Sequence, residues 1–146
     1  MRNIQRSALV PYSAAQMFAI VDDIEAYPEF LPWCSGTTVH RREADQVEAT
    51  LELRRRDLSQ TFRTRNTNRP TDSIEMALIE GPFRHLLGKW SFTQLSDAGS
   101  KVELQLSFEL SSGVLDALLG RFFEDICNSL VDAFKQRADA IYGQPR

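Results

Sequence analysis

The apolar residues between Ser112 and Tyr142 recur with the period of an α-helix. At about 100° per residue they fall on one side, and the charged residues fall on the other. The apolar side contains Leu115, Leu118, Leu119, Phe122, Phe123, Ile126, Cys127, Leu130, Val131, Phe134 and Ile141. Ser112 with Gly113 favours a helix start, and Gly143 with Pro145 favours a stop. The apolar face is wider than the roughly 100° stripe that a surface helix needs, so the pattern predicts a large concave partner.

The N-terminal part predicts one strand and two short helices. Apolar and polar residues alternate weakly over 3–10, which favours a strand. Ser13 and Gln16 have the spacing of a capping box, which marks the start of the first helix. The Asp22–Asp23 pair can cap the second helix, and we expect that helix to end at Pro28.

From residue 37 to residue 110 the hydrophobic pattern changes to a period of two, which is typical of strands with one buried face. Six strands are predicted, in the segments 37–43, 47–54, 58–68, 74–78, 86–92 and 102–110. Their short spacing and tight turns favour an antiparallel meander. We therefore expect one domain (1–146) with an α+β helix-grip fold. Its strongly curved antiparallel sheet of about seven strands would wrap around the long C-terminal helix, with two short helices after the first strand.

The composition narrows the classes of partner. With 17 basic and 20 acidic residues the net charge is −3, which disfavours DNA and any nucleic-acid binding driven by net charge alone. Cys34 and Cys127 fit no metal-binding spacing, so we expect no metal. The N-terminus lacks the apolar region of a signal peptide, and no stretch approaches 18 apolar residues. We expect a cytoplasmic protein that contacts the inner face of the membrane at most transiently.

Several segments of the chain are similar to one known family. They are Ala-Leu-Val-Pro-Tyr-Ser-Ala (8–14), Tyr-Pro-Glu-Phe-Leu-Pro-Trp-Cys (27–34), Gly-Pro-Phe (81–83) with Leu86, Gly88, Trp90 and Phe92 after it, and Ala133-Phe134 with Arg137-Ala138. Over essentially its whole length the chain resembles the RatA/coenzyme Q-binding family of START-like, polyketide cyclase-type domains. The resemblance implies a helix-grip fold with a hydrophobic cavity and no cofactor. It also implies one of two roles: binding ubiquinone in support of respiration, or acting as a ribosome-associating toxin that blocks subunit association.

A cavity between the sheet and the long helix would be lined by side chains that point inward. The candidates are Phe62, Met76, Leu78, Trp90, Leu104 and Phe108 from the sheet, and Leu119, Phe122, Ile126 and Leu130 from the helix. For each of them, a plain core position is the alternative. Trp33 and Phe83, which we expect in loops, would line the cavity mouth or touch a membrane surface.

Thr64 and Asn66 are the polar residues on this inward face. In the predicted register they share it with Val47, Ala49 and Phe62. Buried hydroxyl and amide groups need hydrogen-bond partners. A quinone carbonyl, a water molecule or a neighbouring strand can supply one.

Eight arginines within 41–69 make this part of an acidic protein locally basic. A solvated strand face is the first interpretation, because a turn at Arg56-Asp57 places Glu48 opposite Arg65 and Glu52 diagonal to Arg63. The family pattern has glycine where this chain has Asp57, a residue type that tolerates left-handed geometry.

The hairpin tip has fewer acidic residues around it than the strands do. Arg54, Arg55 and Arg56 cluster there, and they are the candidates for contact with the large ribosomal subunit.

The sequence gives little support to catalysis. His40 and His85 lie in strand-like segments without a spaced acidic or nucleophilic partner. Ser35 lacks the G-x-S-x-G context of a nucleophile and is better explained as a turn residue. We expect a non-enzymatic protein that binds a polyprenyl quinone such as ubiquinone as a ligand rather than as a catalytic cofactor. The alternative is a ribosome-associated toxin of a toxin–antitoxin system.

Overall fold

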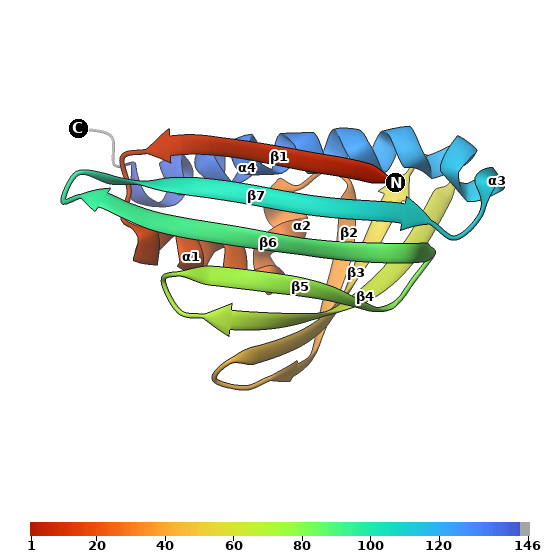
Figure 1. Ribbon diagram of the computed structural model, residues 1–146, viewed down its shortest axis with the longest axis horizontal. Coiled ribbons are helices and arrows are strands. Elements are labelled where there is room, and N and C mark those ends of the chain that lie inside the picture. The colour runs from red at the N-terminus through yellow and green to blue at the C-terminus, as the bar shows by residue number, and fades with distance from the viewer. Residues whose placement is uncertain (144–146) are drawn as a thin grey trace.

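The computed structural model describes residues 1–143. Seven strands form one antiparallel sheet in the order β1-β7-β6-β5-β4-β3-β2 (Figure 1). Their bounds are β1 (Arg2–Val10), β2 (Cys34–Arg42), β3 (Gln46–Arg55), β4 (Leu58–Arg69), β5 (Ser73–Glu80), β6 (Phe83–Ser96) and β7 (Gly99–Leu110). The first strand closes against the last, so β1 and β2 are the two edges of the sheet. The expected order of elements is confirmed.

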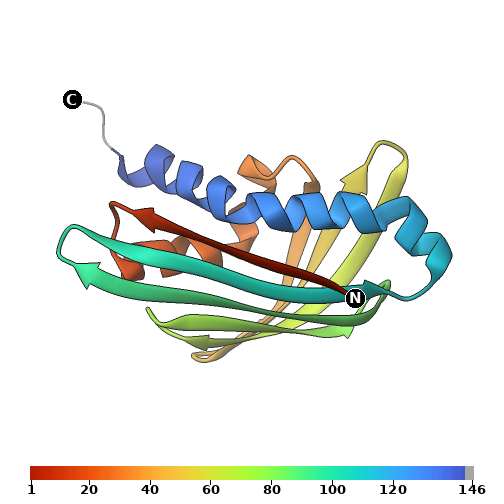
Figure 2. The ribbon, with the colours of Figure 1, turned by 45° about the horizontal axis from the view of Figure 1, so that its top comes forward.

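The helices lie on one face of this sheet. Short helices follow β1: α1 (Ala14–Asp22), a 3₁₀ turn (Ile24–Ala26) and α2 (Tyr27–Phe30). The C-terminal helix consists of α3 (Gly113–Leu115), a π-helical turn (Asp116–Gly120) and α4 (Arg121–Tyr142). It crosses the concave face of the curved sheet (Figure 2). This is the predicted helix-grip arrangement, and it buries both apolar surfaces against each other.

The long helix packs unevenly on the sheet, mainly against β1, β7 and α1. Polar contacts reinforce that side: Arg2 of β1 pairs with Asp116 at 3.2 Å and with Glu124 at 2.5 Å. Arg6 donates to Asn128 at 3.0 Å. The helix is thereby fixed along one edge of the sheet, which leaves space between it and strands β3 and β4.

The helix departs from the regular periodicity expected for 112–142. Ser112 caps its start as predicted, with its hydroxyl accepting from the Leu115 amide. The π-helical turn then shifts the residues around the helix axis relative to a regular α-helix. Leu118 is therefore half-exposed instead of facing the core. Ile141, in the last turn, is also exposed. Of the predicted stop, Gly143 follows the last helical residue, and Pro145 lies outside the described residues.

The first short helix begins as expected, but the second does not end as expected. Ser13 and Gln16 form the predicted capping box. Pro28 lies in the first turn of α2 and does not terminate a helix. Proline fits there because the first turn leaves its backbone N–H groups without intrahelical partners.

The β3–β4 hairpin turns at Arg56-Asp57 with the predicted register. Glu48 lies opposite Arg65. The left-handed residue of the turn, however, is Arg56, with φ of 52°, whereas Asp57 has a negative φ. The turn therefore forms without the family glycine, and it is Arg56 rather than Asp57 that takes the left-handed conformation. The tip tolerates arginine because its side chain points to solvent, at a backbone cost of about 1–2 kcal/mol.

None of the helices in residues 1–143 has the length and apolar character needed to cross a membrane.

Candidate functional site

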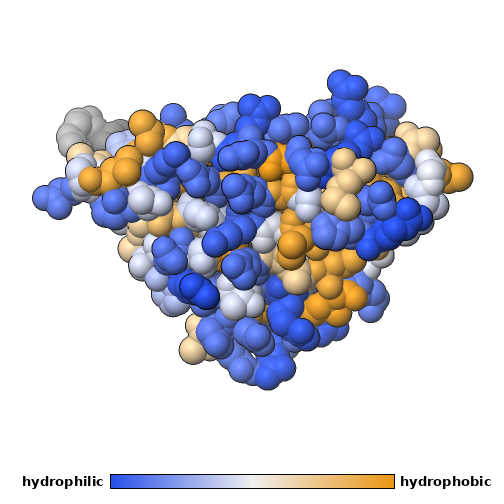
Figure 3. Space-filling model, viewed as in Figure 1, coloured by the Kyte–Doolittle hydropathy of each residue, from blue (hydrophilic) through white to orange (hydrophobic). Residues whose placement is uncertain are grey.

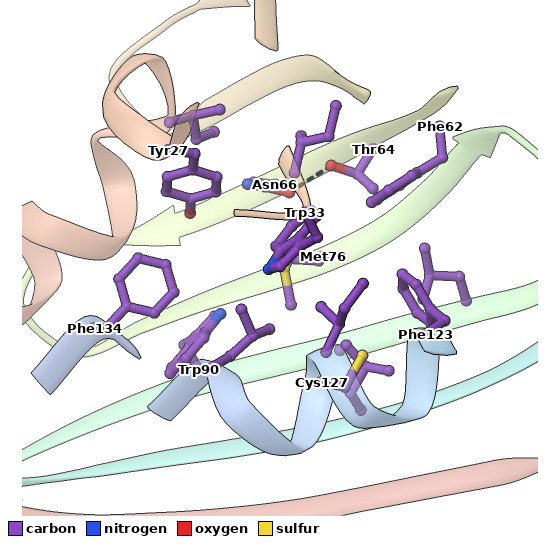
Figure 4. A pocket seen from close by; sticks show the side chains of 17 residues that line it. Tyr27, Trp33, Phe62, Thr64, Asn66, Met76, Trp90, Phe123, Cys127 and Phe134 are labelled. Atoms are coloured by element: carbon purple, nitrogen blue, oxygen red, sulfur yellow. Dashed lines mark hydrogen bonds between the residues drawn. The ribbon is translucent and has the colours of Figure 1, made fainter. Parts of the chain in front are cut away.

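A small apolar cavity lies between α4 and the concave face of the sheet, with a volume of about 80 Å³ (Figure 4). It occupies the space that the off-centre helix leaves over the sheet, and strands β3 to β7 all contribute lining residues. Its lining residues come from helices, strands and the loop before β2: Ile24, Tyr27, Trp33, Leu51, Phe62, Thr64, Asn66, Met76, Leu86, Gly88, Trp90, Leu106, Phe123, Ile126, Cys127, Leu130 and Phe134.

Thr64 and Asn66 bring polar atoms to this apolar wall. Both are buried, at 6% and 8% exposure, and the Thr64 hydroxyl donates to Asn66 Oδ1 at 3.1 Å. The bond is drawn in Figure 4. Among residues 1–143, Asn66 Nδ2 has no hydrogen-bond partner. Thr64 can engage only one of the two polar atoms of the amide, so the other remains available to the cavity.

The rest of the wall is largely aromatic. Trp90 and Phe134 meet edge to face with their ring centroids 5.2 Å apart, and Phe134 meets Tyr27 in the same way at 5.4 Å. Tyr27 turns its hydroxyl away to donate to the carbonyl of Val21 at 2.5 Å. Burial raises the pKa of this tyrosine, so it stays neutral at physiological pH. These rings form a rigid apolar surface at one end of the cavity.

Gly88 sets the depth of the cavity beside Met76. The two residues are paired across β5 and β6, and a Cβ at Gly88 would lie 2.7 Å from Met76 Cε. It would also lie 3.3 Å from Leu106 Cδ1. The missing side chain therefore makes room for the thioether of Met76.

The structure brings most of the predicted cavity residues together. Eight of them line the cavity: Trp33, Phe62, Thr64, Asn66, Met76, Trp90, Ile126 and Leu130. Five do not: Leu78, Leu104, Phe108, Leu119 and Phe122. Leu104, Phe108 and Leu119 are buried in the close-packed region where the helix rests on the sheet. Leu78 is half-buried near the β5–β6 turn, and Phe122 lies beneath Arg55. The alternation of apolar and polar residues identified the inward face of the sheet. It carries no information on where along that face the helix touches the sheet.

Phe83 is also displaced from its expected role at a loop surface. It is the first residue of β6 and only 8% exposed. The centroid of its ring lies 5.0 Å from the ring centroid of Phe123 and 5.7 Å from that of Phe62. It therefore belongs to the core and cannot touch a membrane, because Gly81-Pro82 turns the chain inward one residue earlier than expected.

Several lining residues were not among the predicted ones: Ile24, Tyr27, Leu51, Leu86, Gly88, Leu106, Phe123, Cys127 and Phe134. Phe123, Cys127 and Phe134 were on the predicted apolar face of the helix, so the signal for them existed. Ile24 and Tyr27 reach the cavity through the packing of the short helices, which the local sequence does not specify.

The cavity wall offers little for acid–base or nucleophilic chemistry. Its residues include no Asp, Glu, His, Lys or Arg. Burial raises the pKa of the Cys127 thiol, which disfavours the reactive thiolate. His40 and His85 lie in strands away from the cavity, within hydrogen-bond distance of Thr50 and Ser107. Ser35 donates to Glu52. Within residues 1–143 no cluster of His, Cys, Asp and Glu side chains could hold a metal ion.

The arginines of the strands and those of the hairpin tip have different surroundings. Glu48 is 7% exposed and accepts from Arg63 at 3.0 Å and from Arg65 at 3.4 Å. These hydrogen bonds, first of all that from Arg63, lower the pKa of Glu48. Arg63 and Arg65 are thus paired across the strands as expected, although Arg63 pairs with Glu48 and Glu52 instead accepts from Ser35. In the described part of the chain, Arg54 and Arg56 have no acidic partner within 4.0 Å.

The family model for polyketide cyclase/dehydrase and lipid transport proteins matches residues 10–135. That range contains strands β2 to β7, α1 and most of α4, so it covers both walls of the cavity. The chain belongs to this family. The resemblance stated from the sequence is thereby confirmed.

Curated relatives cover 90–99% of the chain. The ribosome association toxin RatA of Pseudomonas aeruginosa is 45% identical over 97% of this chain and 98% of its own length. That of Vibrio cholerae is 43% identical over 99% of this chain and 100% of its own. The mitochondrial coenzyme Q-binding protein COQ10 of Dictyostelium discoideum is 26% identical over 90% of this chain and 66% of its own.

Solved structures agree on the fold. A START superfamily protein from Mycobacterium smegmatis superposes with a TM-score of 0.79 at 20% identity, covering 95% of this chain and 98% of that one. The Zhui aromatase/cyclase from Streptomyces sp. R1128 gives 0.82 at 16% identity, covering 94% and 93%. At such identities they establish the helix-grip fold of this family member and nothing about its chemistry.

Proposed function

We propose that this START-like protein binds a lipophilic ligand with a carbonyl-bearing ring, of the polyprenyl quinone class to which ubiquinone belongs, without catalysing a reaction. The observation that carries the proposal is the Thr64–Asn66 pair in an otherwise apolar wall. The free Asn66 N–H groups can donate to a quinone carbonyl, and the aromatic wall can receive the face of the ring. Apolar pockets with a few placed polar groups are typical of sites for such ligands.

The cavity must enlarge before a quinone ring can enter it. A volume of about 80 Å³ is well below the roughly 300–1,000 Å³ of sites that enclose drug-sized ligands. Met76 and Trp33 are half-buried lining residues, one with a flexible unbranched side chain and the other in a loop. We expect these two side chains to move when a ring enters, and the polyprenyl tail to leave the cavity on their side.

The direct test is to purify the protein from quinone-replete cells and to extract it for lipid mass spectrometry. Co-purified quinone, together with saturable binding of a short-chain ubiquinone in a titration, is the expected result. If neither quinone nor any other lipid is recovered and the titration shows no binding, the proposal is wrong.

A substitution at Asn66 separates specific from unspecific binding. Asn66→Ala removes the donor, and we expect the affinity for short-chain ubiquinone to fall about tenfold, as one hydrogen bond to a carbonyl is lost. The matched control is Asn128→Ala, because Asn128 lies on the side of α4 that faces Arg6 and not the cavity. Equal losses in both variants would contradict a role of Asn66 in recognition.

A second candidate function is association with the large ribosomal subunit. It is favoured by the full-length relatives named ribosome association toxin, at 43–45% identity. In this chain, Arg54, Arg55 and Arg56 are the proposed contact, because none of them has an ion-pair partner within 4.0 Å among residues 1–143.

Sucrose-gradient profiles after overexpression test this second function. A reduced peak of intact ribosomes, restored by reversing the charge of all three tip arginines to Glu, is expected. Reversal of Arg84, Lys89 and Lys101 is the control, because each of these cations is already paired with a glutamate on the sheet. An unchanged ribosome peak with the native protein would rule the function out.

A further inference from the structure

The tip of the β3–β4 hairpin and the start of the C-terminal helix meet at one end of the molecule (Figure 2). The contact is made by Arg55, whose guanidinium carbon lies 5.0 Å from the centroid of the Phe122 ring. Leu58 is paired with Arg55 in the hairpin, and Leu118 lies four residues before Phe122 along the helix. We call this surface the apex and define it as Arg54, Arg55, Arg56, Leu58, Val114 and Leu118.

Three aliphatic side chains of the apex are exposed to solvent. Val114 is 70% exposed, Leu118 50% and Leu58 37%. Figure 3 shows hydrophobic side chains at the α3 end of the molecule, next to hydrophilic ones. Single exposed leucines are ordinary, but these three aliphatic residues belong to the two elements that meet through the contact of Arg55 with Phe122.

The same surface is cationic. Neither Arg54 nor Arg56 has an ion-pair partner among residues 1–143. Arg55 is held over an aromatic ring and not by an acid. The acidic residues at the start of the helix are already engaged, since Arg2 pairs with both Asp116 and Glu124. Asp57 of the same turn offsets only one of the three arginines, so the apex presents a net positive charge in a protein whose total charge is −3.

We infer that the apex is a docking surface for an anionic lipid bilayer. Lipid phosphates at the surface can accept from the arginines, while Val114, Leu118 and Leu58 enter the boundary between head groups and acyl chains. An RNA partner would use the arginines but would leave the three aliphatic side chains in water. The inference does not depend on ligand binding, since the surface lies outside the cavity, and it competes with the ribosomal contact proposed for the same three arginines.

The apex is connected to the cavity by the backbone. The amide of Arg54 donates to the carbonyl of Trp33 at 2.9 Å, and the Trp33 side chain lines the cavity. A bilayer bound at the apex would thus lie beside the lining residue that we expect to move. Because the apex and the cavity are adjacent, a lipophilic ligand could pass between the membrane and the cavity with little contact with water.

Vesicle co-sedimentation tests the inference with the full chain. Native protein is mixed with vesicles of phosphatidylcholine alone or with one quarter phosphatidylglycerol, at low and at moderate salt. We expect binding to the anionic vesicles only, weakening as salt rises. The double variant Val114→Ser/Leu118→Ser should lower the partition coefficient at least fivefold, and Arg54→Glu/Arg56→Glu should lower it at least tenfold.

The control variant is Leu87→Ser/Leu95→Ser, which removes two leucines of similar exposure from β6 without touching the apex. It should bind vesicles like the native protein. The inference is overturned by absence of binding to anionic vesicles, or by equal losses in this control. It is also overturned if, in parallel sedimentation, the arginine variant no longer binds ribosomal subunits but still binds vesicles, while the aliphatic variant binds both like the native protein. The apex would then be an RNA contact.

Discussion

Gly88 of β6 lies directly opposite Met76 of β5, and the absence of a side chain at Gly88 gives the Met76 thioether its place in the cavity wall. The pair controls how much space lies between the sheet and α4. It therefore offers a way to change the cavity in both directions.

Gly88→Ala should reduce ligand binding. The new methyl group would lie 2.7 Å from Met76 Cε, the flexible end of a side chain, which would be pushed into the cavity. We expect at least a fivefold weaker affinity for short-chain ubiquinone in a fluorescence titration, with the fold retained. An affinity equal to that of the native protein would show that the ligand does not use this part of the cavity.

Met76→Ala should increase ligand binding. Removing a half-buried side chain enlarges the cavity and should cost about 1–3 kcal/mol of unfolding free energy, measured by urea denaturation. We expect more quinone to co-purify with this variant than with the native protein. A variant that is destabilised but retains no more ligand would contradict the proposed path of entry.

Glu48 should make stability depend on pH in the acid range. Its hydrogen bonds with Arg63 and Arg65 lower its pKa in the folded state, so the stabilisation is fully present above the ordinary glutamate pKa of about 4.3. It is lost as the pH falls through the lowered value. Urea denaturation should show Glu48→Gln less stable than the native protein at pH 7, with the difference shrinking below about pH 4.

Glu75→Gln is the matched control for that experiment, because Glu75 is more than half exposed and lies 3.8 Å from Lys89. Its effect should be small at every pH. A difference for Glu48→Gln that stays constant from pH 7 to pH 3 would exclude the carboxylate charge as the cause.

Thr71→Gly should stabilise the fold. This β-branched residue has φ of 64° in the β4–β5 turn, a conformation that glycine adopts at no steric cost. We expect a gain of about 0.5–1 kcal/mol in thermal or urea denaturation, since the relief of about 1–2 kcal/mol exceeds the entropic cost of glycine. Thr93→Gly, within β6, should instead destabilise. A loss of stability at both positions would contradict the strained turn.

Gly81→Ala should destabilise strongly. A Cβ there would lie 2.7 Å from Phe62 Cβ and 3.2 Å from Phe62 Cα, and φ is +156°. Backbone and core must both shift, so we expect a loss of more than about 2 kcal/mol in urea denaturation. Gly36→Ala is the comparison, because nothing lies within 4 Å of its added methyl group. Similar stabilities of the two variants would show that the Gly81 turn yields easily.

Periodicity was sufficient for the architecture because each element must bury one face. The alternation from β3 to β7 and the wide apolar face of 112–142 predicted a curved sheet around a helix, and the structure has that arrangement. The register that places Glu48 opposite Arg65 also followed from the hairpin turn. A shift by one residue would have turned every inward side chain to solvent, so the pattern permits a single register.

The placement of the cavity could not be predicted in the same way. Leu104, Phe108 and Leu119 point inward as expected, yet they are packed, whereas Ile24 and Tyr27 reach the cavity from short helices. The pattern along the chain specifies which faces are apolar and which polar pair points inward. The position of the helix on the sheet depends on tertiary packing, because Arg2 and its acidic partners fix the helix toward β1 and the remaining gap becomes the cavity.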